Sequence, residues 1–241
     1  EPATLIASIS SSTNLSCSGS CDGTASVSAS GGTNPYTYLW TGGQTTVTAS
    51  GLCAITVNVT VSDNQGCQDS TSTTLSEPTL LTLSESSIDA SCYGVCDASA
   101  TISANGGTIP YTYVWNDPGS QTTATAGGLC AGTYVAQVTD NNGCVSSSTV
   151  AISEPLTIST AIVQELGVYC FSDCDGLAEV AAAGGTTPYT YLWSDGQTAA
   201  LAINLCAGTY AVMISDANGC ALVDSAIITE PLALTNVFSS T

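Results

Sequence analysis

The sequence predicts an all-β chain of three disulfide-bonded antiparallel β-sandwich repeats, and three observations lead to this fold class. A ten-residue phrase recurs as GGTNPYTYLW (31–40), GGTIPYTYVW (106–115) and GGTTPYTYLW (184–193). The cysteines form three sets of four with nearly equal spacing. Short segments that alternate apolar and polar residues lie between Gly, Asn and Asp clusters, a pattern typical of strands joined by tight turns.

Glu-Pro dipeptides mark the boundaries of the repeats. They occur at 1–2, 77–78, 154–155 and 230–231. We therefore expect β-sandwich repeats at residues 1–77, 78–154 and 155–230. Residues 231–241 resemble the beginnings of the earlier units, so they are expected to begin a fourth repeat in a longer protein, with a strand after Pro231.

The third repeat illustrates the predicted strands one by one. Alternating or apolar segments lie at 156–162, 177–183, 189–193, 198–203, 209–215 and 221–228. None of them keeps the 3.6-residue apolar period of an amphipathic helix. Six or seven short strands with frequent turn signals in one repeat favour an immunoglobulin-like antiparallel sandwich.

The PYTYxW phrase places three aromatic residues on one face of a strand. Side chains alternate along a strand, so Tyr36, Tyr38 and Trp40 point to the same side. We predict that the tryptophans at the end of each phrase are core residues: Trp40, Trp115 and Trp193. The alternative is an exposed platform of Tyr and Trp side chains that stacks against sugars.

The charge balance excludes several classes of function. The chain has 19 acidic residues and no Lys, Arg or His, for a net charge of -19. Nucleic-acid binding relies on basic residues, and a strongly negative chain is repelled by anionic membrane surfaces. Neither nucleic-acid binding nor membrane insertion is therefore expected. His and Lys are common catalytic groups, and no carboxylate pair marks a cleft, so we expect no enzymatic activity.

Twelve cysteines without histidine favour disulfides over zinc. Zinc ligands usually come as two closely spaced pairs, whereas only the first two cysteines of each set are close together. Disulfides persist in oxidising compartments, so the sequence predicts an extracellular or cell-surface protein.

Six aspartates are candidates for a calcium site. Asp22, Asp97 and Asp175 follow the second cysteine of each set, and Asp63, Asp140 and Asp216 open the later turns. Calcium prefers such oxygen ligands. The favoured alternative is that each aspartate binds the backbone of its own turn, so the expected cofactor and metal content is none.

The motif order resembles a known family. CxGxCDG, GGTxPYTYxW, LCAGTY, DNxGC and EP follow one another in this chain, as in the SprB-type repeat of very large cell-surface adhesins of Bacteroidota. Ile55 and Val57 depart from the LCAGTY phrase in the first repeat. The resemblance implies a surface-exposed tandem array, linked to gliding motility and exported by type 9 secretion.

Strand geometry and the resemblance together predict the disulfides. A strand near 55–62 separates Cys53 from Cys67, too far for a bridge, which leaves two pairings within each repeat. The resembling repeats often keep only their first and last cysteines, which implies that those two pair and that CSGSC runs extended. The expected bridges are Cys17–Cys67, Cys21–Cys53, Cys92–Cys144, Cys96–Cys130, Cys170–Cys220 and Cys174–Cys206.

The leading functional hypothesis is a structural or adhesive repeat module that forms the stalk or fibre of a large secreted adhesin. The alternative is a carbohydrate-binding module that uses the exposed aromatics of the PYTYxW strand. Expected partners are neighbouring repeats of the same chain, with lateral self-association into fibres and surface polysaccharide as further candidates.

Overall fold

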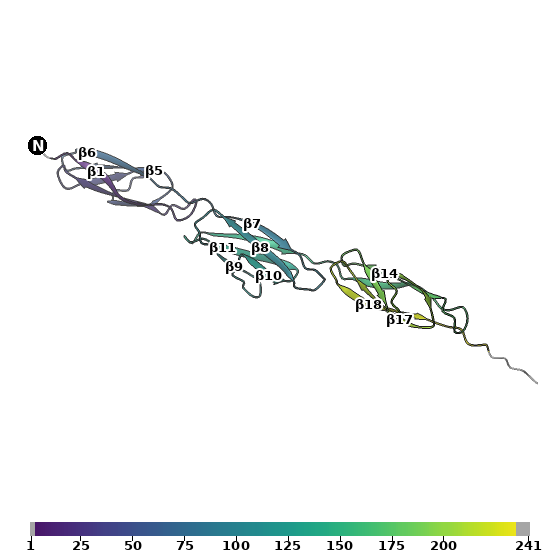
Figure 1. Ribbon diagram of the computed structural model, residues 1–241. Coiled ribbons are helices and arrows are strands. Elements are labelled where there is room, and N and C mark those ends of the chain that lie inside the picture. The colour runs from purple at the N-terminus through teal and green to yellow at the C-terminus, as the bar shows by residue number, and fades with distance from the viewer. Residues whose placement is uncertain (1–2, 235–241) are drawn as a thin grey trace, which may run out of the picture. The chain divides into compact units, whose positions relative to one another are not determined.

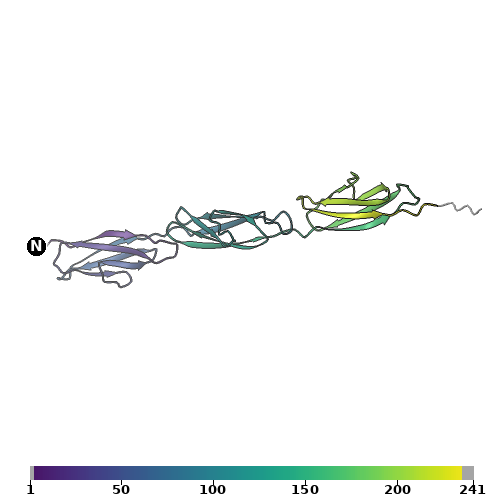
Figure 2. The same cartoon turned by 90° about the horizontal axis from the view of Figure 1, so that it is seen from below.

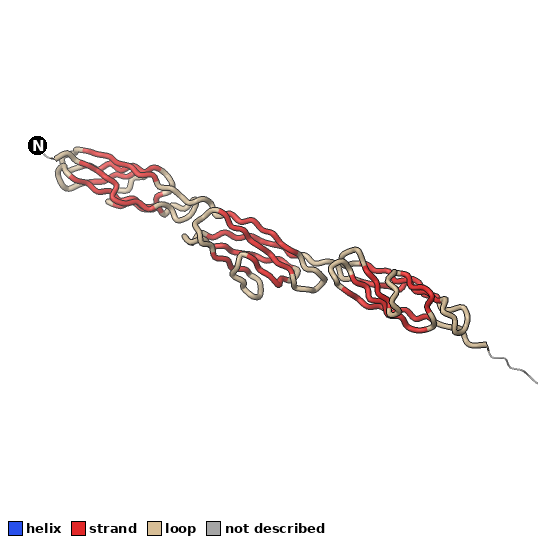
Figure 3. The backbone as a smooth tube through the Cα atoms, in the orientation of Figure 1, coloured by secondary structure: helices blue, strands red, loops and turns tan. Residues whose placement is uncertain are grey.

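The computed structural model describes residues 3–234, and these form only strands, turns and loops (Figures 1 and 3). The all-β prediction is confirmed. No helix that could cross a membrane occurs in this part of the chain. The predicted strand after Pro231 is not seen at residues 231–234, and the rest of that segment, 235–241, lies outside the described residues.

Each repeat contributes six strands. The first contains β1 (Ile6–Thr13), β2 (Gly23–Ser30), β3 (Thr37–Trp40), β4 (Thr48–Leu52), β5 (Thr56–Ser62) and β6 (Gln68–Thr74). The second contains β7 (Thr82–Ile88), β8 (Ala98–Asn105), β9 (Thr112–Trp115), β10 (Thr125–Leu129), β11 (Gly132–Thr139) and β12 (Val145–Ile152). The third contains β13 (Ser159–Leu166), β14 (Gly176–Ala183), β15 (Thr190–Trp193), β16 (Leu201–Leu205), β17 (Gly208–Ser215) and β18 (Ala221–Ile228).

The strands of each repeat pair into two three-stranded antiparallel sheets. In the first repeat the orders are β1-β2-β4 and β3-β5-β6, and both other repeats use the same order. These sheets correspond to strands A-B-E and C-F-G of an immunoglobulin sandwich without strand D. Figure 2 shows the strands of the three repeats in a second view, from below.

The core of each repeat lies between its two sheets. In the first repeat, alanines and valines of β2 and β5 meet the buried Trp40 of β3. The indole Nε1 of Trp40 donates to the carbonyl of Thr46 at 2.8 Å, so the polar atom of this side chain is satisfied. Trp115 and Trp193 are also almost fully buried, 1% exposed each. The tryptophan of the recurring phrase is therefore a core residue in all three repeats.

The first strand of the third repeat differs from its expected range. The sequence favoured 156–162, whereas β13 spans Ser159–Leu166. The carbonyl of Leu156 instead accepts a hydrogen bond from Gly185 N–H at 2.8 Å, and β13 stays paired with β14 as far as Leu166 and Leu177. The residues after Glu-Pro are thus hydrogen-bonded to the loop that contains Gly184 and Gly185, here called the Gly-Gly loop, and the strand begins later.

The Gly-Gly loop fits closely over the start of its own repeat. In the second repeat Gly107 N–H donates to the carbonyl of Thr79 at 2.8 Å. Gly106 has a φ of 80°, and a Cβ built there would lie 2.0 Å from the carbonyl oxygen of Leu80. Only glycine combines this backbone conformation with such a close approach. The loop therefore fixes residues 79–80, which lie next to the cavity described below.

Contacts group the chain into two compact units. One comprises 1–86, 101–126 and 134–150, and the other comprises 87–100, 127–133 and 151–241. This division cuts through the second repeat and does not follow the Glu-Pro dipeptides, so the boundaries at 77 and 154 remain a prediction. Every disulfide described below lies inside one of these two units.

Candidate functional site: the junction between repeats

Two disulfides join cysteines of different repeats, and this corrects the expected pairing. Cys17 is bonded to Cys144, with 5.7 Å between their Cα atoms, and not to Cys67. Cys92 is bonded to Cys220 at 5.8 Å, and not to Cys144. The first cysteine of one repeat therefore pairs with the last cysteine of the next.

The third expected first-to-last pair is also absent. Cys170 is not bonded to Cys220, because Cys220 is joined to Cys92. Cys67 and Cys170 are free and exposed. The physical reason is that Cys53 and Cys67 flank β5, and Cys17 lies on the Cys53 side because Cys21, in the same loop, is bonded to Cys53. The chain between Cys17 and Cys21 is too compact to span the length of that strand. A hydrogen bond from Ser20 N–H to the Cys17 carbonyl, at 3.1 Å, closes this segment into a turn, where an extended run was expected.

The remaining bridges have the expected partners. Cys21 is bonded to Cys53, Cys96 to Cys130 and Cys174 to Cys206. Each fastens the CxxxC loop to the end of the fourth strand of its own repeat. The second cysteine thus holds the loop in place within the repeat, which leaves the first cysteine available to the next repeat.

An aspartate shapes the CxxxC loop. Asp22 Oδ1 accepts the N–H of Ser16 at 3.1 Å and the hydroxyl of Ser20 at 2.7 Å. Hydrogen bonds from the side chains of Ser16 and Ser20, together with that from the Ser16 N–H, lower the pKa of Asp22 to about 2. Asp97 and Asp175 accept the N–H of the residue before the first cysteine in their own repeats. These three aspartates therefore position the first cysteine of the CxxxC loop in their own repeats.

A second aspartate shapes the turn that presents the last cysteine. Asp140 Oδ1 accepts the N–H groups of Asn142 and Cys144, at 2.9 and 2.8 Å. Its Oδ2 accepts Thr108 N–H at 2.8 Å. Burial alone would raise the pKa of Asp140, but these hydrogen bonds outweigh it and lower the pKa. Asp63 and Asp216 make the equivalent bonds in their repeats.

Two further hydrogen bonds accompany the Cys17–Cys144 bridge. Asn142 Nδ2 donates to the carbonyl of Ser16 at 2.9 Å. The carboxylate of Glu77, which belongs to the Glu-Pro dipeptide, accepts Gly19 N–H at 2.6 Å. The bridge, the side chain of Asn142 and the Glu-Pro carboxylate therefore converge on the same CxxxC loop.

The second junction repeats these contacts. Asn218 Nδ2 donates to the carbonyl of Ser91 at 2.8 Å, and Glu154 accepts Gly94 N–H at 2.6 Å. Both junctions thus share four features: the disulfide, the hydrogen bond from the asparagine side chain, the hydrogen bond to the Glu-Pro glutamate, and the turn held by an aspartate. We define this set as the repeat junction.

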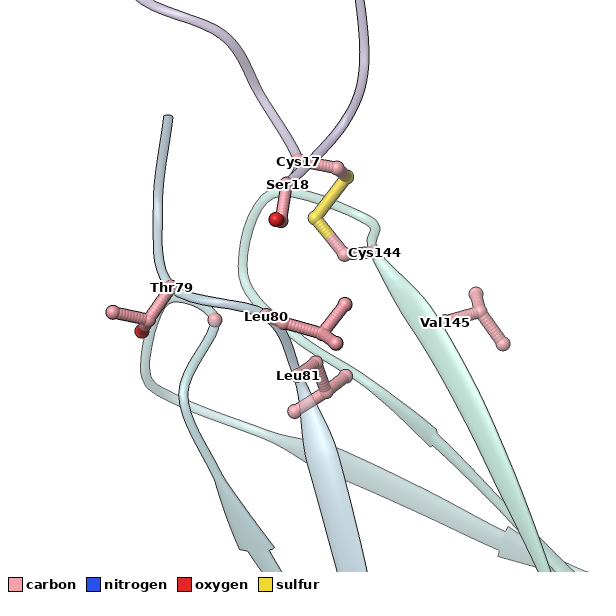
Figure 4. Close-up of a pocket in the computed structure, with 8 residues that line it drawn as sticks. Cys17, Ser18, Thr79, Leu80, Leu81, Cys144 and Val145 are labelled. Carbon is pink, nitrogen blue, oxygen red and sulfur yellow. A yellow bond between two sulfur atoms is a disulfide. The ribbon is translucent and has the colours of Figure 1, made fainter. Parts of the chain in front are cut away.

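A small cavity adjoins the first bridge. It has a volume of about 140 Å³, and its lining includes Cys17, Ser18, Leu80 and Cys144. Figure 4 shows the sulfur–sulfur bond beside Ser18, with Leu80 and Leu81 below it. The cavity is too small for a drug-sized ligand. The arrangement is therefore suited to joining repeats, and nothing in its chemistry indicates a substrate site.

Three of the calcium candidates, Asp63, Asp140 and Asp216, accept hydrogen bonds from backbone N–H groups at both carboxylate oxygens. In each of them, Oδ1 accepts N–H groups of the aspartate's own turn. Oδ2 accepts the N–H of a threonine that follows the Gly-Gly pair of the same repeat. Among residues 3–234 no group of three or more His, Cys, Asp or Glu side chains could hold a metal ion. Because N–H groups point at these oxygens, a cation would have to displace them before it could bind.

The tyrosines of the recurring phrase are half-buried. Tyr36 and Tyr38 pack against the core that contains Trp40, whereas Leu39, between them and Trp40, is 57% exposed. Tyr36 Oη donates to the carbonyl of Gly31 at 2.5 Å. The alternation of faces follows the prediction, and these side chains belong mainly to the core.

The tyrosine of the LCAGTY phrase forms a hydrogen-bonded corner in the third repeat. Tyr210 Oη accepts the N–H of Cys206 and donates to its carbonyl, at 3.2 Å each. In the first repeat Val57 takes this position and is 1% exposed. The departure from the LCAGTY phrase therefore replaces a hydrogen-bonded corner by core packing.

The Asp140→Asn variant tests the turn. The amide nitrogen of the variant would face either the N–H of Thr108 or those of Asn142 and Cys144, so at least one hydrogen bond is lost at pH 7. A carboxyl group whose pKa is lowered by folding stabilises the protein above its ordinary pKa of 3.8 and loses this effect as the pH falls through the folded value. We therefore expect the variant to melt below the wild type at pH 7, with a difference that shrinks towards pH 2.

Thermal melts at several pH values, followed by circular dichroism, check this expectation. Asp173→Asn is the matched control, because it also removes one negative charge but lies on an exposed loop. It should leave the melting temperature almost unchanged. An Asp140→Asn deficit of the same size at pH 2 as at pH 7 would show that the carboxylate charge is not what holds the turn.

The repeat model of one family matches the chain at three places, residues 9–45, 84–120 and 168–198, and the family is the SprB repeat. The repeats are of the SprB type. Each SprB match covers part of the first strand or the segment after it, the cysteine pair and the tryptophan strand. The turns with Asp63, Asp140 and Asp216, and with them the last cysteines, lie outside the matched segments.

Solved structures similar to these SprB-type repeats share little sequence. Three N-terminal domains of the highly immunogenic outer capsid protein of bacteriophage RB49 align over 95% of this chain and 100% of that one, at 12% identity and a TM-score of 0.45. The eight N-terminal immunoglobulin domains of Down syndrome cell adhesion molecule align over 81% of this chain and 33% of that one, at 12% identity and a TM-score of 0.40. No curated protein matches the chain.

Proposed function

We propose that this chain is a structural module of a large secreted cell-surface adhesin, and that its SprB-type repeats form part of a stalk or fibre that carries tension. The observation that carries the proposal is the Cys17–Cys144 bridge together with its counterpart Cys92–Cys220. These bonds connect successive repeats independently of the backbone that links them. A module whose purpose is to transmit force benefits from such a second connection.

The bridges shorten the covalent path through the chain. Starting at residue 1, the shortest path crosses from Cys17 to Cys144 and runs back to Cys130. It then crosses to Cys96, runs back to Cys92 and crosses to Cys220. Only about 60 residues of backbone lie on this path, or roughly 200 Å at about 3.6 Å per residue. Without bridges the whole chain would extend to roughly 860 Å.

Single-molecule stretching from tags at the two termini tests the proposal. The oxidised chain is expected to stop near 200 Å after every repeat has unfolded, and the chain in dithiothreitol is expected to extend about four times as far. Bridges confined to single repeats would give an intermediate limit of roughly 330 Å. An oxidised chain that extends as far as the reduced one would remove the mechanical basis of the proposal.

Location and export belong to the same proposal. Disulfides form and persist outside the reducing cytosol, which supports an extracellular module. A role in gliding motility and export by type 9 secretion are expected from the motif resemblance to Bacteroidota adhesins. Localisation of the full-length protein by antibody on intact cells, with and without a functional type 9 system, tests this part.

Carbohydrate binding is the weaker alternative. It requires aromatic faces open to solvent, and Tyr36 and Tyr38 pack against the core instead. We expect no change in tryptophan emission when surface polysaccharide is added to the folded chain.

A further inference from the structure

The two free cysteines occupy positions that are bridged in other repeats. Cys67 corresponds to Cys144 and Cys220, which are bonded to the preceding repeat. Cys170 corresponds to Cys17 and Cys92, which are bonded to the following repeat. Two bridges in the same chain therefore show that the first cysteine of one repeat pairs with the last cysteine of the next repeat.

The turn around Cys67 already has the geometry of a junction. Asp63 Oδ1 accepts the N–H of Cys67 at 2.9 Å, and Asp63 Oδ2 accepts the N–H of Thr33 at 2.9 Å. Asp140 makes the same bonds at the bridged Cys144. Gln65 stands where Asn142 donates its amide across the first junction, so the first repeat also carries an amide donor at that place.

The loop around Cys170 has the matching half. Asp175 accepts the N–H of Tyr169 at 3.1 Å, and Glu230 accepts the N–H of Ser172 at 3.2 Å. These bonds reproduce those of Asp22 and Glu77 at the first junction. The Cys170 loop is therefore held in the same way as the loops whose first cysteine is bridged.

Apolar side chains surround the exposed Cys170. Tyr169 and Phe171 are 71% and 53% exposed. These residues line a cavity of about 520 Å³ that contains Cys170. Cys170 therefore lies in an exposed and largely apolar surface.

We infer that Cys67 and Cys170 are the two open halves of one repeat junction, and that each takes a further SprB-type repeat as its covalent partner. Cys67 receives the first cysteine of a CxxxC loop from a repeat on its N-terminal side. Cys170 receives the last cysteine of an Asp-x-x-Gly-Cys turn from a repeat on its C-terminal side. The inference extends the proposed stalk function by naming the partner, and the bridge has a fixed polarity.

Formation of this bridge is an ordinary thiol–disulfide exchange. The Cys67 thiolate attacks a small disulfide such as oxidised glutathione, which forms a mixed disulfide and releases one reduced glutathione. The thiolate of the partner's first cysteine then attacks the Cys67 sulfur and releases the second glutathione. Two electrons and two protons pass from the two thiols to the glutathione disulfide, so the step balances.

A tandem fusion of two copies tests the inference. Residues 1–229 are followed directly by residues 1–241, so that the second Glu1-Pro2 replaces Glu230-Pro231 and the spacing of the Glu-Pro dipeptides is kept. Cys67→Ser in the first copy and Cys170→Ser in the second leave one unpaired cysteine on each side of the new junction. The fusion is refolded with oxidised and reduced glutathione at low concentration.

The expected product is a monomer without reactive thiol. A peptic digest without reductant should contain a peptide that links Cys170 of the first copy to Cys67 of the second. A control fusion that carries Cys170→Ser in the first copy in addition to the two substitutions above should keep one reactive thiol, that of Cys67 in the second copy. Two reactive thiols in the folded monomer, or disulfide-linked dimers of the fusion, would overturn the inference. Either result would leave the stretching limit of the single chain, and with it the test of the proposed function, unaffected.

Discussion

Removal of an inter-repeat bridge, such as Cys17–Cys144, is expected to lower the melting temperature more than removal of a bridge within one repeat. The bridge closes a loop with a sequence separation of 127 residues. In the chain-entropy model, closure of such a loop stabilises the folded state by about 5 kcal/mol, against about 4 kcal/mol for a loop of the Cys96–Cys130 type. For a chain of this size, 5 kcal/mol corresponds to a shift of roughly 10 to 20 °C.

The double variant Cys17→Ser/Cys144→Ser avoids leaving an unpaired thiol at the junction. Calorimetry of this variant, beside Cys67→Ser as the control that removes a cysteine without a bridge, measures the effect. Cys67→Ser should melt like the wild type. Equal melting temperatures of the double variant and the control would mean that the bridge is not formed in solution.

Truncation of a core tryptophan is expected to have the next largest effect. Trp115 is 1% exposed, and its Nε1 donates to the carbonyl of Thr123 at 2.9 Å. Trp115→Ala leaves a cavity between the sheets and an unpaired carbonyl, which costs about 3 to 5 kcal/mol. The second repeat should therefore melt first, as a separate transition in calorimetry.

Val114→Ala is the matched control for this variant. Val114 lies next to Trp115 on β9 but on the outer face, where it is 51% exposed. Its truncation should change the melting temperature very little. Similar losses for the two variants would contradict the assignment of the tryptophan to the core.

The sequence was sufficient to predict the fold because its signals are local. Alternation along 209–215 places Tyr210, Val212 and Ile214 on one face, and β17 buries that face. The recurring phrase puts Trp40 on the inner side of β3 by the same two-residue period. The start of the first strand was less predictable, because the hydrogen bond from Gly185 to Leu156 joins residues far apart in the sequence.

The junction could not be predicted because every repeat carries the same cysteine pattern. A bond from Cys17 to Cys67 and a bond from Cys17 to Cys144 use the same two types of position, and the spacing does not say which copy supplies the partner. The one available signal was the length of β5, which separates Cys67 from Cys53 and so from the CxxxC loop that is bonded to Cys53. The need for an extended CSGSC segment already indicated strain in the within-repeat pairing, and the Ser20–Cys17 turn shows that the segment is compact.

Peptide mapping without reduction tests the central claim most directly. The folded chain is alkylated at low pH to block its free thiols and then digested with pepsin, because it has no Lys or Arg for trypsin. The structure predicts peptides that link Cys17 to Cys144 and Cys92 to Cys220, with Cys67 and Cys170 alkylated. Peptides that link Cys17 to Cys67 and Cys92 to Cys144 would contradict it and would confine every bridge to a single repeat.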